Sequence, residues 1–165
     1  MFSPDDIYRQ RLKLFSIQTL DRSTQLEHYA VELPRLTPMA LDPSVDPELR
    51  SLAKRVCRDH ARELEKVAGK LESNLKQALP GEESADDVSF RSLFGDHDPG
   101  LEDLADVISQ RSLGISKYVY TFIFPDQHTV ELDELRSPDI FNELEFLREL
   151  TGKYMQGIEQ VLEAP

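Results

Sequence analysis

Three residues whose side chains could do chemistry lie close together in the first half of the chain: Cys57, His60 and Glu63. They are spaced three residues apart, so neighbours would touch on one side of a helix. A thiol, an imidazole and a carboxylate in this arrangement could bind a metal ion or move a proton. A structural zinc site normally takes four ligands, however. The simpler interpretation is a buried, hydrogen-bonded histidine with Cys57 as a small core residue.

The sequence does not match the other common templates for catalysis or cofactor binding. Its seven glycines fit neither the dinucleotide-binding nor the P-loop pattern, and no G-x-S-x-G turn is present. No acid stands three residues before a histidine, as helical di-iron sites require. The acids around Asp98 and Glu102 lack the spacing of a calcium loop, and we interpret them as a helix cap and a solvated first turn. We therefore expect no cofactor, and an enzyme only where scattered residues assemble a site.

The charge of the chain is divided unevenly between its two halves. The net charge is −12; residues 1–79 contain 13 Lys and Arg against 12 Asp and Glu, whereas residues 80–165 contain 6 against 19. A surface with this field is repelled by nucleic acid and by anionic membranes, and it attracts basic proteins. Acidic surfaces also keep proteins soluble, which is the simpler interpretation.

Length and composition predict one cytoplasmic domain over residues 1–165. A chain of 165 residues with 39% hydrophobic residues can form a core of its own. No run approaches the ~18 apolar residues of a membrane span, and the first residues lack the pattern of a secretory signal. The single cysteine, Cys57, suits a reducing compartment. We expect a bacterial protein.

Four helix starts can be identified from a capping residue followed by proline: Ser3-Pro4, Asp46-Pro47, Asp98-Pro99 and Ser137-Pro138. They predict helices over residues 4–20, 47–79, 100–113 and 138–163, the third ended by Gly114. A further helix over residues 22–33 either follows the first or continues it. The prolines at positions 34, 38 and 43 predict an extended connection up to residue 46, and residues 80–99 predict an acidic loop.

The helix over residues 47–79 has an apolar stripe opposite a basic face. The stripe comprises Leu49, Leu52, Ala53, Val56, Cys57, Leu64, Val67, Ala68, Leu71, Leu75 and Ala78. Basic residues recur every four positions along a winding ridge: Arg50, Lys54, Arg58, Arg62, Lys66 and Lys70. We expect the ridge to pair with acids of the last helix, such as Glu143, Glu145 and Glu149.

A β-hairpin is predicted over residues 116–133, just before the last helix. Its first strand is rich in β-branched and aromatic residues, and Pro125-Asp126 is a turn signal. A buried helix over residues 115–124 is the alternative, because short apolar runs are ambiguous. Both faces of the strand are apolar, so the hairpin could form a homodimer or partner interface. The residues expected to bind a partner are Tyr118, Tyr120, Phe122 and Phe124 of the hairpin, with Asp86, Asp87, Phe90 and Phe94 of the acidic loop.

Together these patterns predict a mainly α bundle of four or five helices with one β-hairpin. The function they favour is a non-enzymatic protein-binding module: an adaptor, specific chaperone, immunity or regulatory protein that presents an acidic surface to a basic protein. We expect no direct binding to nucleic acid or membranes. The alternative is a helical-bundle protein that binds a metal ion through His60 and nearby groups.

Overall fold

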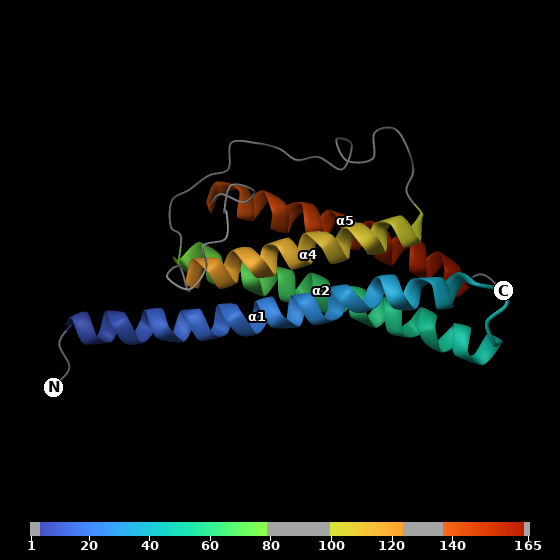
Figure 1. The fold of residues 1–165 in the computed structure, drawn as a ribbon, viewed down its shortest axis with the longest axis horizontal. Coiled ribbons are helices and arrows are strands. Elements are labelled where there is room, and N and C mark those ends of the chain that lie inside the picture. The colour runs from blue at the N-terminus through green and yellow to red at the C-terminus, as the bar shows by residue number, and fades with distance from the viewer. Residues whose placement is uncertain (1–3, 79–99, 124–136, 164–165) are drawn as a thin grey trace.

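The computed structural model describes residues 4–78, 100–123 and 137–163, which form four long helices (Figure 1). They are α1 (Pro4–Leu41), α2 (Pro47–Ala78), α4 (Leu101–Ile123) and α5 (Ser137–Glu163). The mainly helical bundle is confirmed. Within the described residues there is neither a β-strand nor a fifth helix.

Neighbouring helices of the bundle run antiparallel to one another. α1 packs against α2 and α4, and α5 packs against the same two helices on the opposite side. α2 and α4 therefore lie on a diagonal, and Figure 1 shows that both run in the same direction. The chain between them joins opposite ends of the bundle, a connectivity with one long crossover.

Buried side chains on each helix follow the spacing of three and four residues that a bundle requires. On α1 the buried positions are Thr19, Ser23, Leu26, Ala30, Leu33, Thr37 and Ala40. α5 contributes large residues to the same core, among them Leu147, Leu150, Tyr154 and Ile158. α2 contributes several small residues, including Ala53, Cys57 and Ala61. α4 and α5 approach closely at Gly157, where an added Cβ would lie 2.5 Å from Leu101 Cδ2 and 3.2 Å from Leu101 Cγ.

α1 does not stop at its prolines, so the predicted extended connection over residues 34–46 is wrong up to Leu41. Pro34 and Pro38 both lie inside the helix, although an interior proline typically costs about 3 kcal/mol. The last turns bury Leu33, Thr37 and Ala40 completely, and burying a large apolar side chain contributes about 1.5–3 kcal/mol. Core packing therefore outweighs the local signal, and of the two alternatives for residues 22–33 the continuous helix is the correct one.

A short turn follows α1. The amide of Asp42 donates to the Pro38 carbonyl at 2.9 Å, which closes the helix. Asp42 Oδ1 then accepts from the amide of Ser44 at 2.9 Å and from its hydroxyl at 2.7 Å. α2 begins at Pro47 as predicted, with the Asp46 carbonyl accepting from the Arg50 amide at 2.8 Å.

α4 continues through Gly114, so both its predicted end at Leu113 and the first strand of the hairpin are wrong. Ile108, Ser112, Ile115 and Val119 are all buried at spacings of four, three and four residues, which is the period of a helix. Packing of this stripe overrides the β-propensity of the aromatic and β-branched residues. The alternative of a buried helix is the correct one as far as Ile123. The predicted second strand lies outside the described residues.

Candidate functional site

Among the residues predicted to bind a partner, the structure describes the side chains of two, Tyr118 and Tyr120, and these two lie on different faces of α4. Tyr118 is buried in the core, with 5% of its surface exposed. Tyr120, two residues further along α4 and therefore on the other side of the helix, is 42% exposed. Position 122 lies in α4. The other five residues of that set, Phe124, Asp86, Asp87, Phe90 and Phe94, lie outside the described residues. The predicted strand with two apolar faces is wrong for residues 117–123, because these residues are helical.

Cys57, His60 and Glu63 do not converge, although they share one helix. Cys57 is fully buried, and burial raises the pKa of its thiol. Glu63 turns to solvent and pairs with Lys66 at 3.6 Å. Within residues 4–78, 100–123 and 137–163, no three His, Cys, Asp or Glu side chains are grouped so that they could hold a metal ion.

His60 lies at the α1–α2 interface rather than in the centre of the core. Its half-buried ring contacts two rings of α1, Tyr29 with centroids 5.3 Å apart and His28 with centroids 6.4 Å apart. Burial lowers the pKa of His60, and nearby Glu32 opposes that shift. The fold therefore favours the neutral imidazole.

A polar cluster at the centre of the bundle contains the only cysteine. The Tyr154 hydroxyl and Thr37 Oγ1 lie 2.7 Å apart across the diagonal between α5 and α1. Thr37 Oγ1 also lies 2.6 Å from the Leu33 carbonyl, to which it donates. Its single proton is used there, so Tyr154 is the donor to Thr37. Cys57 contacts the same two hydroxyls, and burial raises the pKa of Tyr154. These hydroxyls are satisfied and shielded from solvent, so the cluster fixes the helices relative to one another.

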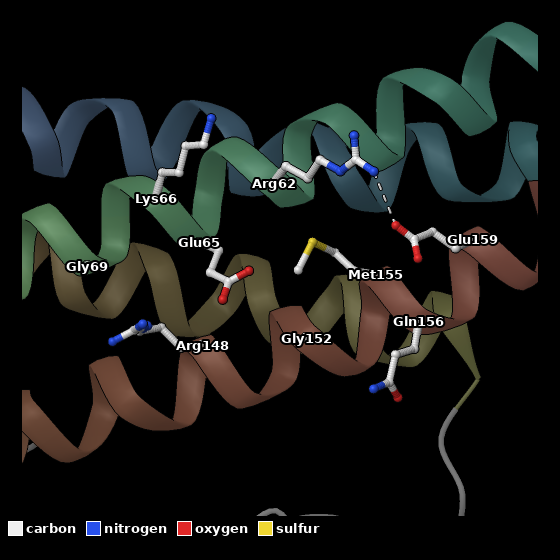
Figure 2. Close-up of a pocket in the computed structure, with 9 residues that line it drawn as sticks. All are labelled: Arg62, Glu65, Lys66, Gly69, Arg148, Gly152, Met155, Gln156 and Glu159. Atoms are coloured by element: carbon white, nitrogen blue, oxygen red, sulfur yellow. Dashed lines mark hydrogen bonds and ion pairs between the residues drawn. The ribbon is translucent and has the colours of Figure 1, made fainter.

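A groove of about 680 Å³ runs between α2 and α5 (Figure 2). It is hollow partly because Gly69 and Gly152 face it, and an added Cβ at either glycine would meet no atom within 4 Å. Met155 points across it towards α2. The other lining residues are Arg62, Glu65, Lys66, Arg148, Gln156 and Glu159.

The cations around this groove are paired with carboxylates. Arg62 bonds Glu159 at 3.3 Å, and Arg148 bonds Glu72 at 3.3 Å. Among the described ion pairs of the basic ridge, Arg62 pairs with α5 as predicted, but with Glu159. Arg58 and Lys66 instead pair with Asp59 and Glu63 of α2 itself. Glu143, one of the expected partners, instead bonds Arg111 of α4 at 2.9 Å. A groove with neutralised cations offers little charge to an anionic ligand.

Carboxylates gather at one end of the bundle. Figure 1 shows that α1 and α5 end where α2 and α4 begin. The exposed acids in these terminal turns and in the α1–α2 connection are Asp42, Asp46, Glu48, Glu102, Asp103, Asp106 and Glu163, called the acidic end below. Neither α1 nor α5 has a basic residue in its last turn. The basic residues in the first turns of α2 are Arg50, Lys54 and Arg55, and Lys54 donates to the Val161 carbonyl of α5 at 3.4 Å.

Two exposed leucines accompany these acids. Leu49 is 44% exposed and Leu52 is 54% exposed, although the sequence predicts both in the core stripe of α2. The stripe is buried only from Ala53 onwards, because α2 begins beyond the last buried turn of α1. Leu52 lines a shallow hollow of about 450 Å³ with Pro47, Glu48, Ser51 and Arg55. Periodicity alone could not identify this surface, since it does not show where a helix leaves the core.

The fold defines a class, a four-helix bundle with one crossover, but no family. Comparison with protein-family models, curated proteins and solved structures finds no significant match for the chain. Among the described residues, no helix has both the length and the apolar character needed to cross a membrane.

Proposed function

We propose that this protein is a non-enzymatic protein-binding module whose acidic end binds a basic protein. The observation that supports the proposal is that two exposed leucines, Leu49 and Leu52, lie at the same end of the bundle as seven exposed carboxylates. Protein interfaces typically combine an apolar centre with a polar rim. Carboxylates at the same end of the bundle as the leucines would attract a basic partner and orient it.

Some of these acids have a simpler structural role. Three of them lie in the first turns of α2 and α4: Glu48, Glu102 and Asp103. Their negative charges are stabilised there by the positive end of the helix dipole. Glu163 lies in the last turn of α5, where a negative charge is unfavourable for the helix. Its position therefore supports a role in binding rather than in helix stability.

The test compares binding by the tagged full chain and by two sets of variants. The protein is used to capture partners from a lysate of its source at low and high salt. We expect one stoichiometric basic protein, retained at low salt and lost at high salt. Leu49→Ser with Leu52→Ser should abolish capture. Glu163→Gln with Asp106→Asn should weaken it, and this pair does not remove the helix-capping acids.

Leu113→Ser is the matched control, because Leu113 is also an exposed leucine, 42% exposed, but lies on the middle of α4. It should capture the partner as the wild type does. Circular dichroism confirms that each variant is folded. Capture of nothing at either salt, or equal capture by the Leu49 and Leu52 variants, contradicts the proposal.

A further inference from the structure

Three rings meet at the interface between α1 and α2. The half-buried ring of His60 on α2 contacts Tyr29 of α1 edge-on, with centroids 5.3 Å apart and planes at 76°. His28, which is exposed, lies beside both rings, with its centroid 5.4 Å from that of Tyr29 and 6.4 Å from that of His60. Two imidazoles on different helices therefore lie close enough to repel each other when both are protonated.

Burial is the largest influence on the protonation of His60, and it lowers the pKa of this ring. The charged groups that act on the ring are Glu32 and His28 of α1 and Asp59 of α2. The two carboxylates favour the imidazolium form, whereas the second histidine disfavours it. The closed interface therefore resists protonation of His60.

The other two helices meet α1 and α2 on different sides. Arg62 stands roughly 200° around the axis of α2 from His60, and it bonds Glu159 of α5 at 3.3 Å. On α1, Glu27 faces α4 and accepts from Ser116 at 2.9 Å. The two histidines are therefore influenced mainly by the contact between α1 and α2 itself.

Separation of α1 from α2 at this level would return water to the ring of His60. The ring would then bind a proton more readily, and its distance from His28 would increase. A conformation that binds protons more tightly gains population as the pH falls, because proton binding and conformation are linked. Acid therefore favours the separated helices over the closed ones.

We propose that His28 and His60 form a pH-sensitive contact at which proton uptake loosens α1 from α2. A natural reporter lies beside this contact. Cys57 is fully buried three residues before His60 on α2, and Thr37 of α1 contacts its thiol. Loosening of the interface therefore exposes this thiol, and the chain has no other cysteine.

The first experiment measures how fast an aromatic disulfide that reacts with thiols in mild acid labels Cys57 of the full chain. Each rate is divided by that of the urea-unfolded protein at the same pH, which removes the effect of pH on the thiol itself. We expect this relative rate to rise as the pH falls through 6.5, the ordinary pKa of histidine. His28→Gln with His60→Gln should remove the rise. The matched control replaces the other two histidines of the chain, His97→Gln with His128→Gln, and should keep it.

Low concentrations of urea separate this loosening from global unfolding. Labelling through a local opening depends little on urea, whereas labelling through unfolding depends on urea as strongly as stability does. A relative rate that does not change with pH, a rise that survives the loss of both histidines, or labelling through unfolding alone overturns the proposal.

An NMR titration of the imidazole signals tests the pairing of the two histidines in the folded protein. His28→Gln replaces an exposed side chain and should raise the pKa of His60, because it removes a like charge. Glu32→Gln should lower the same pKa, because it removes an opposite charge. A pKa of His60 that does not respond to His28→Gln overturns the pairing.

Discussion

Replacing the hydroxyls of Thr37 and Tyr154 singly and together tests the buried polar cluster. Thr37→Val and Tyr154→Phe each remove one hydroxyl and keep the shape of the side chain. The two hydroxyls lie 2.7 Å apart, and Thr37 also lies 2.6 Å from the Leu33 carbonyl. Both residues are fully buried, so water does not replace the lost bond.

The two single substitutions should differ in cost, because they leave different groups behind. In Tyr154→Phe, Thr37 still donates to the Leu33 carbonyl, so the loss is one hydrogen bond, about 1 kcal/mol. In Thr37→Val, the Tyr154 hydroxyl loses its acceptor inside the core, which costs about 1–3 kcal/mol. The Leu33 carbonyl keeps the backbone N–H of residue 37 as its donor in the helix. The adjacent Cys57 sulfur is only a weak acceptor, so we expect about 2 kcal/mol for Thr37→Val.

The double variant should be less destabilised than the sum of the two. With both hydroxyls gone, no buried donor is left without a partner, and the total should be about 1.5 kcal/mol against a sum near 3 kcal/mol. Urea unfolding followed by circular dichroism at neutral pH gives the four free energies. Additivity within about 0.5 kcal/mol refutes the coupling. A larger loss in Tyr154→Phe than in Thr37→Val refutes Tyr154 as the donor.

Three further predictions concern the helix interfaces. Folding lowers the pKa of His60 below its unfolded value of 6.5, so its contribution to stability is complete above pH 6.5 and is lost as the pH falls through the pKa of the folded state. His60→Gln should therefore make the free energy of unfolding depend less on pH in this range, as urea unfolding at several pH values would show. Gly152→Ala should stabilise α5 by about 0.5–1 kcal/mol, whereas Gly157→Ala should lose this gain through its clash with α4, as thermal unfolding would show. Arg111→Met should cost about 2 kcal/mol in urea unfolding, because Glu143 is only 8% exposed and loses its partner at 2.9 Å, and adding Glu143→Gln should recover part of that loss.

Capping residues predicted where helices begin better than proline and glycine predicted where helices end. Asp46-Pro47 and Ser137-Pro138 mark the beginnings of α2 and α5 correctly, because a cap is a local property of a few residues. Pro34 and Gly114 are local signals too, but tertiary packing outweighs them. The buried stripes of α1 and α4 continue past both residues. A stop signal therefore predicts a helix end only where the apolar period also ends.

The candidate surfaces were harder to predict from sequence than the core. The stripe of α2 correctly placed Cys57, Leu64 and Leu71 inside. It placed Leu49 and Leu52 inside as well, although the neighbouring helices do not cover the first turn of α2. Relative helix lengths are a tertiary property, and periodicity within one helix does not contain them.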